Sequence, residues 1–391
     1  MDAPREDVGH AQERVIGGKN SDSSQDAVVM VVWLDPSGQG LGSCTGTMLA
    51  PNLVMTARHC VSDTEETAAC DQDGNPIGGS GAIYGTHTAS SMLVFKGTSS
   101  PKFFETGNPN DVKPDGVGAK IMDDGGKSLC NHDVALIVLK DPIKGIPIAP
   151  IRLEKDSKVG EAFTAVGWGI TSTGNMPTTR QQRTGIKIQD IGPDLSDYGP
   201  LPPNEFQVGE AICQGDSGGP ALASTGAVIG VVSRGGNGMA QSQSDPAAGC
   251  INAMNIYTKV EPFKTLILSA YTAAGQDPWI EGGPDPRLAK TDDACSQATD
   301  CRSNICLGDP GQSASAVTCA QDCSDGSTCP DGETCQAVGG QQVCRTPIPD
   351  DTSTSSKGCA SAPSSPSSGI LAFAVAALGI AFTRRRRGSS S

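Results

Sequence analysis

The chain has 391 residues, more than one ordinary domain needs, so two or more structural units are expected. Its 49 glycines, its low aromatic content of 4% and its 37% of hydrophobic residues favour a turn-rich β protein with a modest core over a helical bundle. A formal net charge of −14, with no basic stripe except at the extreme C-terminus, argues against nucleic acid as a partner.

The 15 cysteines fall into two even groups and one remaining residue. Six lie between Cys44 and Cys250, eight lie between Cys295 and Cys344, and Cys359 stands alone. Even groups indicate disulfide frameworks in an oxidising compartment. A cytosolic zinc protein is the alternative, but the group of eight contains no histidine and only one CxxxC spacing. We therefore predict secretion, without a metal or a cofactor.

The N-terminal residues 1–7 are charged and contain no apolar core, so they do not predict a signal peptide. For a secreted protein, this means that the true start lies upstream or that a leader is missing from the printed sequence.

Apolar or β-branched runs bounded by turn formers predict strands over 28–33, 49–55, 135–139, 162–166, 226–233 and 255–260. Apolar residues at helical spacing predict a closing helix over 262–274. Short strands and frequent turn signals imply an all-β fold of two packed antiparallel β-barrels, with a cleft between them.

The glycine-rich stretch 213–220 carries the strongest chemical signal. Gly215 and Gly218 allow a tight turn around Ser217, and such a turn can aim the amides of Gly215 and Ser217 at one point, as the oxyanion of acyl transfer requires. A serine hydroxyl becomes a good nucleophile only when an oriented base takes its proton. His59 follows one predicted strand and Asp133 precedes another. An ordinary surface turn, a surface histidine and a buried structural aspartate are the alternatives.

The motifs 56–60 (TARHC), 131–136 (NHDVAL) and 213–220 (CQGDSGGP), in this order, resemble those of the trypsin/chymotrypsin family of serine proteases. The resemblance covers about residues 15–275. It implies a peptide or protein substrate, with Ser217 as nucleophile, His59 as general base and acid, Asp133 as the carboxylate that orients the imidazole, and the amides of Gly215 and Ser217 as the oxyanion hole.

The stretch 14–18 (RVIGG) resembles the activation site of this family. By this resemblance, residues 1–14 are a propeptide, and an activating protease cleaves after Arg14. The freed ammonium of Val15 would then pair with Asp216 and lock the oxyanion loop. Apolar residues at the start of a strand are the alternative.

The resemblance also suggests disulfides. Cys44 and Cys60 match the family's bridge beneath His59, and Cys213 and Cys250 are expected to pair beside the pocket. The segment 62–129 is longer than the family minimum; Cys70 and Cys130 bracket it and are predicted to pair. Within this segment, residues 71–75 offer alternating oxygen ligands, but the twelfth position of the loop is Ala82, so an acidic turn is favoured over a calcium loop.

The residues expected around the substrate depart from those of trypsin. Ala211 falls where trypsin has an aspartate at the pocket floor, so nothing there would pair with a Lys or Arg side chain. Ile212 is bulky, Asn255 falls near a wall glycine, and Gly235 keeps one wall open. We therefore predict a preference for small or medium uncharged side chains, with an edge that pairs with the substrate backbone formed by Ser233, Arg234 and Gly235.

Three further segments follow the predicted protease domain. Residues 276–293 are rich in Gly, Pro and Asp and are predicted to be a linker. Residues 294–346 form a module that must depend on disulfides, because it has almost no apolar run. This module resembles cysteine-rich modules appended to secreted myxobacterial proteins, which implies a binding or spacing role. Residues 347–368 are rich in Pro, Ser and Thr and are predicted to be disordered.

The C-terminal residues 369–391 contain an apolar run over 369–383, followed by four arginines at 384–387. The run is short for a stable membrane span. Together with Cys359, it resembles the C-terminal sorting signal of exported myxobacterial proteins. This implies recognition by sorting machinery, transient membrane anchoring and cleavage or lipid attachment near Cys359. A plain short anchor is the alternative.

We therefore predict a secreted or cell-surface serine endopeptidase that is made as a zymogen. The alternatives are a catalytically silent binding protein with a protease fold and an adhesion or spacer protein. The presence of His59, Asp133, Ser217 and Gly215 together favours the enzyme.

Overall fold

The computed structural model describes residues 16–346, apart from residues 36–40, 66, 172–177, 197–198, 240–241, 243 and 309–316. The predicted propeptide with Arg14, the predicted new N-terminus Val15, and the C-terminal segments with Cys359 lie outside the described residues.

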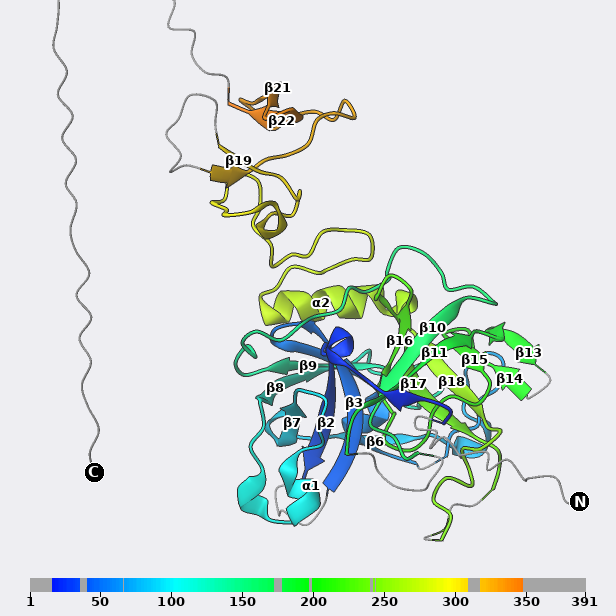
Figure 1. Ribbon diagram of the computed structural model, residues 1–391. Helices are drawn as coiled ribbons and strands as arrows, with labels where there is room; N and C mark the ends of the chain where they lie inside the picture. The colour runs from blue at the N-terminus through cyan, green and yellow to red at the C-terminus, as the bar shows by residue number, and fades with distance from the viewer. Residues whose placement is uncertain are drawn as a thin grey trace, which may run out of the picture. The chain divides into compact units, whose positions relative to one another are not determined.

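The first half of the predicted protease domain forms a closed antiparallel barrel (Figure 1). Its strands, in the order in which they pair, are β2 (Val28–Leu34), β3 (Leu41–Ala50), β4 (Leu53–Thr56), β9 (Ala135–Leu139), β8 (Gly116–Met122) and β7 (Met92–Phe95). The prediction of one strand over 49–55 is wrong. Pro51 and Asn52, both turn formers, divide that run into the end of β3 and the start of β4.

The second half forms an eight-stranded sheet whose neighbours all pair antiparallel. Its order is β1 (Lys19–Asn20), β11 (Gln181–Lys187), β10 (Ala162–Gly167), β16 (Pro220–Ala223), β17 (Val228–Gly236), β18 (Met254–Lys259), β15 (Glu205–Val208) and β12 (Asp190–Ile191). The all-β prediction is confirmed, with one closed barrel and one open order of strands.

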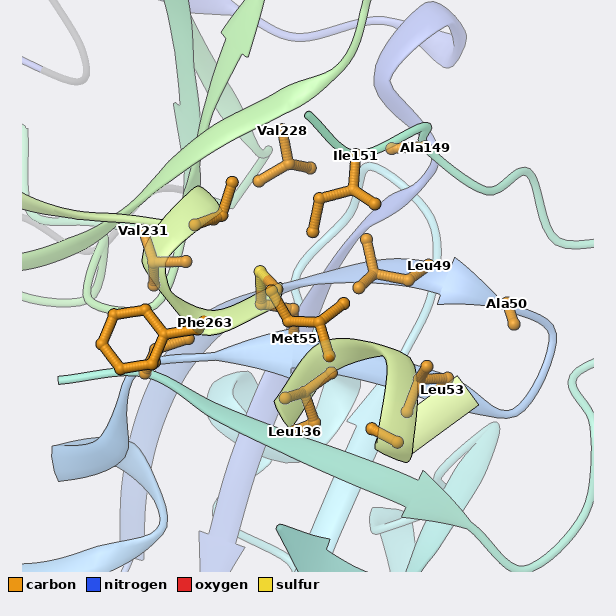
Figure 2. Packing of buried hydrophobic residues seen from close by; sticks show 14 of the residues in the cluster. Leu49, Ala50, Leu53, Met55, Leu136, Ala149, Ile151, Val228, Val231 and Phe263 are labelled. Carbon is orange, nitrogen blue, oxygen red and sulfur yellow. The ribbon is translucent and has the colours of Figure 1, made fainter. Parts of the chain in front are cut away.

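A buried apolar cluster joins the barrel, the second sheet and the closing helix (Figure 2). Met55 and Leu136 contribute from the barrel, Val231 contributes from β17, and Phe263 precedes the helix. The helix α2 (Lys264–Ala274) follows the short 3₁₀ turn η6 (Glu261–Phe263). Together, these two elements cover the predicted helix over 262–274. Because this core contains side chains from both halves of the domain, it holds the two halves together. In such a core, one large-to-small substitution costs about 2–5 kcal/mol of stability.

The long segment between His59 and Asp133 is built from short elements. These are η2 (Arg58–Cys60), β5 (Ser62–Thr64), η3 (Ile77–Gly79), β6 (Ile83–Thr86), η4 (Ala89–Ser91), α1 (Lys102–Thr106) and η5 (Pro109–Asp111), in addition to β7 and β8. Within it, the Asp71 carboxylate accepts hydrogen bonds from the backbone N–H groups of Asp73 and Asn75 at 3.0 and 2.7 Å. The acidic stretch is thus folded as a turn in which the Asp71 carboxylate binds backbone N–H groups of the turn itself.

The segment predicted as a linker contacts the predicted protease domain over its first half. The Ile151 N–H donates to the Trp279 carbonyl, and the Glu281 N–H donates to the Ile151 carbonyl, both at 2.9 Å. Trp279 and Ile280 also pack against the apolar clusters of the domain. Backbone pairing and apolar burial therefore attach this stretch to the domain.

The cysteine-rich region contains η7 (Ala298–Asp300) and the hairpins β19 (Cys306–Gly308) with β20 (Val317–Cys319) and β21 (Thr334–Val338) with β22 (Gln341–Arg345). Four disulfides hold it: Cys295–Cys306, Cys301–Cys319, Cys323–Cys335 and Cys329–Cys344. Its buried apolar core consists of Ile305, Ala320, Val338 and Val343. So small a core leaves the cross-links as the main source of stability.

Two smaller elements complete the described fold, the 3₁₀ turn η1 (Ser23–Gln25) and a hairpin of β13 (Asp194–Ser196) with β14 (Gly199–Leu201). In the described part of the chain, no helix combines the length and the apolar character needed to cross a membrane.

Candidate active site

His59 lies in the turn η2, which directly follows barrel strand β4. The disulfide between Cys44 and Cys60 ties this turn to β3. The imidazole Nδ1 lies 2.8 Å from Asp133 Oδ2, and the His59 N–H donates to Asp133 Oδ1 at 3.0 Å. A carboxylate only accepts, so Nδ1 carries the proton and Nε2 is left with the lone pair that a general base needs.

Asp133 is fully buried and accepts a further hydrogen bond from the Ser233 hydroxyl at 2.6 Å. Burial alone would raise the pKa of Asp133, but the neighbouring His59 and these hydrogen bonds outweigh burial and lower it. Burial would likewise lower the pKa of His59, but the charge of Asp133 and its hydrogen bond raise it above its usual value. The pair is therefore arranged to stabilise an imidazolium.

Ser217 lies in a turn whose glycines cannot be replaced without strain. Gly218 has φ +78°, and a Cβ on it would lie 2.1 Å from the Thr56 hydroxyl oxygen. Gly215 has φ +100°, and a Cβ on it would lie 2.9 Å from the Trp168 carbonyl oxygen. The Thr45 N–H donates to the Ser217 carbonyl at 2.8 Å, which ties the turn to β3. The turn is thus packed tightly between the two halves of the domain.

The amides of Gly215 and Ser217 donate to no acceptor within the described residues. Their neighbours in the turn are engaged, since the Asp216 N–H donates to the Cys213 carbonyl and the Gly219 N–H donates to the Asp216 carbonyl. Two uncommitted donors beside a hydroxyl are the requirement for an oxyanion hole.

His59 and Ser217 both line one cavity of about 300 Å³. The predicted substrate-binding residues that line it are Ile212, Ser233, Arg234, Gly235 and Asn255, and both members of the Cys213–Cys250 disulfide also lie on its wall. Thr64, Glu65, Ala68 and Leu129 close it from the long segment between His59 and Asp133, which the Cys70–Cys130 disulfide staples.

Ala211 does not line this cavity. It is fully buried in an apolar cluster with Phe206 and Val208. Asn255 donates from Nδ2 to the Gly209 carbonyl at 2.9 Å, and its Oδ1 would lie 2.2 Å from a Cβ on Gly235. The Asn255 side chain is therefore packed against Gly235, where a larger residue would not fit, and it lines the cavity. Its position narrows the space for a substrate side chain.

Asp216 is almost completely buried and faces backbone donors. The Gly169 N–H donates to its Oδ1 at 2.7 Å, and the Cys213 N–H donates to its Oδ2 at 3.0 Å. Burial raises the pKa of Asp216 to about 7 despite these two hydrogen bonds. No cation pairs with this carboxylate within the described residues.

Sequence reasoning missed Glu205 and Thr45. The fully buried Glu205 forms a two-pronged ion pair with Arg234, and the Thr45 hydroxyl donates to the Gly215 carbonyl at 2.8 Å. Neither residue belongs to a recognisable motif, and their partners are remote in the chain, so no local signal could have singled them out.

Three groups of possible metal ligands come close together within the described residues. They are Cys44 and Cys60 with His59, the set Cys295, Cys301 and Cys306, and the set Cys323, Cys329 and Cys344. Every cysteine in these groups is bonded in a disulfide and is not a thiolate, so the groups are disulfide crossings and not metal centres.

Comparison with known proteins finds several similar chains. A trypsin from Saccharopolyspora erythraea is 28% identical over 231 residues, which cover 56% of this chain and 86% of that protein. The thrombin-like enzyme elegaxobin-1 from Protobothrops elegans is 28% identical over 240 residues, or 58% of this chain and 87% of that protein. A solved structure titled "Structure of GrC" aligns with a TM-score of 0.44 at 19% identity, over 66% of this chain and 99% of that one. The trypsin family matches residues 15–267, so the chain belongs to this family of chymotrypsin-like serine proteases.

Proposed function

We propose that the protein is a serine endopeptidase that uses Ser217, His59 and Asp133 as a catalytic triad. The observation that carries the proposal is the oriented His59–Asp133 pair, which shares one cavity with Ser217 and its uncommitted amides. In a binding protein, the buried Asp133 and the free oxyanion donors would have no use.

The reaction follows from these positions. Ser217 Oγ attacks the substrate carbonyl carbon, and His59 Nε2 takes the hydroxyl proton. The carbonyl oxygen becomes an oxyanion that the amides of Gly215 and Ser217 stabilise. The imidazolium then gives its proton to the leaving amine, the C–N bond breaks and an acyl-enzyme remains. Water repeats the sequence, with His59 again as base and then as acid, and releases the acid product.

The substrate side chain that enters beside Ser217 is small or medium and uncharged. Ile212 and Asn255 reduce the space in the cavity, and Ala211, at the position of trypsin's aspartate, has no carboxylate to pair with a Lys or Arg side chain. The acidic residue of the described wall is Glu65, which belongs to the segment between His59 and Asp133. The charge of Arg234 is already neutralised by Glu205. The end of β17, with Ser233, Arg234 and Gly235, supplies the edge for the substrate backbone.

The protein is made as a zymogen that another protease activates by cleaving after Arg14. The buried carboxylate of Asp216 supports this step, because it has no cation within the described residues and lies next to Ser217. An ammonium at Val15 would supply that cation and order the oxyanion loop.

The enzyme is exported, and its C-terminal tail directs it to the cell surface or to release. Seven disulfides in the described part of the chain favour an oxidising compartment. The apolar run over 369–383 and the following arginines would hold the tail in the membrane until sorting machinery processes it.

The test is labelling of the full chain by a fluorophosphonate probe, before and after cleavage at Arg14, with Ser217→Ala as the control. Labelling that requires both Ser217 and cleavage is the expected result, together with a loss on the order of 10⁶ in turnover in Ser217→Ala. Absence of labelling in correctly cleaved protein would favour the alternative, a catalytically silent binding protein.

A further inference from the structure

The carboxylate of Glu205, at the start of β15, is completely buried and bound from two directions. Arg234 donates from Nη1 to Oε1 at 2.8 Å and from Nη2 to Oε2 at 2.5 Å. Such a fork of two parallel hydrogen bonds fixes both position and orientation. Because an unpaired buried charge is costly, the Arg234 guanidinium cannot leave this carboxylate freely.

The second contact of Glu205 is to the turn that precedes Asp133. The Asn131 N–H donates to Glu205 Oε1 at 3.1 Å. Asn131 has φ +68°, an unusual backbone conformation for a residue with a side chain. Its side-chain oxygen accepts from the Asn204 N–H at 2.8 Å, and its carbonyl accepts from Asn204 Nδ2 at 3.2 Å. Asn204 and Glu205 thus hold this turn together.

These contacts place Glu205 between the two segments that hold the triad carboxylate. Asp133 lies two residues after Asn131, and Ser233, which donates to Asp133, directly precedes Arg234. We propose that Glu205 is a positioning residue of the triad, which fixes Asp133 from both sides and, through Arg234, also fixes the edge that binds substrate. The inference rests on the proposed function, because it assigns Glu205 a role in that reaction.

The chain offers a matched comparison for a purely structural role. Arg152 and Glu281 form a similar fork, with Nε to Oε2 at 2.7 Å and Nη2 to Oε1 at 2.9 Å. Their side chains are 7% and 4% exposed, and neither lines the cavity that holds Ser217. This pair should contribute to stability without any effect on the triad.

The experiment compares Glu205→Gln with Glu281→Gln in the cleaved full chain on a peptide substrate. In Glu205→Gln, whichever way the amide turns, its NH₂ group faces a donor of Arg234 or of Asn131, so part of the network must open. Both variants should lower Tm. Only Glu205→Gln should also lower kcat, on the order of 10²-fold, because a small misplacement of a catalytic group costs that much.

A second readout separates alignment from stability. Misalignment of Asp133 removes the interaction that raises the pKa of His59, so the acid limb of the kcat/KM profile should move down by about half a pH unit or more. The same shift should appear in the His59 ring titration by NMR, which needs no turnover, and the chain has only four histidines to resolve. Glu281→Gln should leave both readouts at the wild-type value.

The inference is overturned if Glu205→Gln loses only Tm, as Glu281→Gln does, and keeps the wild-type kcat and His59 titration. If Glu205→Gln does not fold, Glu205→Asp keeps the charge but shortens the reach, and the same two readouts decide. A cleaved wild type that is inactive, although His59 titrates with its raised pKa, would contradict the proposed function. An active wild type whose Glu205→Gln variant keeps the same kcat and the same His59 titration contradicts this inference alone.

Discussion

The uncleaved chain should lose stability as pH rises, because Asp216 is buried without a cation in the described structure. The change to make is Asp216→Asn in a Ser217→Ala chain, so that no self-cleavage occurs. The pKa of Asp216 is about 7 in the folded state against an ordinary value of 3.8. A raised pKa means that the folded state holds the proton more tightly than the unfolded state does.

The sign and size follow from this difference. The free energy of unfolding has its full value below about pH 4, falls as pH rises through the interval up to about 7, and is then constant as far as Asp216 is concerned. At about 1.4 kcal/mol per pH unit, the loss over this interval is roughly 4 kcal/mol. Asparagine has no proton to lose, so Asp216→Asn should remove this part of the slope.

The measurement is urea unfolding at several pH values between 4 and 8, followed by tryptophan fluorescence. The three tryptophans, Trp33, Trp168 and Trp279, all precede the cysteine-rich module, so the signal does not come from that module. The difference between the two proteins cancels the other titrating groups. Relative to the parent, Asp216→Asn should gain roughly 4 kcal/mol between pH 4 and 8. A difference that stays constant to within about 1 kcal/mol would refute the reasoning.

Cleavage after Arg14 should reverse the effect. If the Val15 ammonium pairs with Asp216, the ionised carboxylate is stabilised, and Asp216→Asn should then cost about 3–5 kcal/mol near pH 7, since it leaves a buried cation unpaired. The amine should have a raised pKa in this pair, so its contribution should be lost as pH rises through that value. Equal pH slopes before and after cleavage would contradict the pairing.

Three further substitutions and one series of peptide substrates provide the remaining tests. Asp133→Asn should lower kcat on the order of 10⁴-fold, as the same substitution does in a known serine-protease triad. It should also move the acid limb of the kcat/KM profile to lower pH, because the pKa of His59 would fall without the charge of Asp133. An acid limb that does not shift would argue against Asp133 as the carboxylate of the triad. Gly218→Ala should cost more than about 2 kcal/mol in urea unfolding and abolish probe labelling, because its Cβ would lie 2.1 Å from the Thr56 hydroxyl oxygen. Gly226→Ala, with φ +80° but nothing within 4 Å, should cost only about 1 kcal/mol and keep labelling; equal effects of the two would sink the packing argument. Peptides with Ala, Val or Leu before the scissile bond should be cleaved at least as fast as those with Arg, and much faster cleavage after Arg would show that the pocket is misread.

The parts of the fold that sequence predicts well are those encoded locally. The barrel strand β2 and the closing helix are continuous apolar patterns with turn formers at their ends, so their limits follow from periodicity. The exception is the run over 49–55, where apolar residues continue through Pro51 and conceal a turn. There, the turn-forming residues Pro51 and Asn52 end one strand although the residues on both sides are apolar.

The pocket is harder to predict than the triad for a physical reason. The residues proposed as the triad lie in motifs whose neighbours must keep special backbone conformations, such as Gly218 with its positive φ, and this constraint is visible in sequence. A pocket wall depends on which of several adjacent side chains points outward. Counting along the chain places Ala211 at the floor, but it packs into the core, and its neighbour Ile212 lines the cavity instead.

The environment of Asp133 shows why the remaining contacts could not be read from the sequence. Glu205 is 74 residues from Asn131 and 29 from Arg234, and Ser233 is 100 residues from Asp133. The sequence around these residues contains no recognisable motif. An exposed Glu or Arg at the same positions would be surrounded by the same sequence. What makes them significant is burial, because a carboxylate that has left water must keep every partner it has. Contacts of this kind become visible only when the strands β15 and β17 are placed with β18 between them and next to the turn that carries Asp133. The same requirement makes Glu205 a sensitive point for mutation, since removing one partner disturbs the segments on both sides of the triad carboxylate.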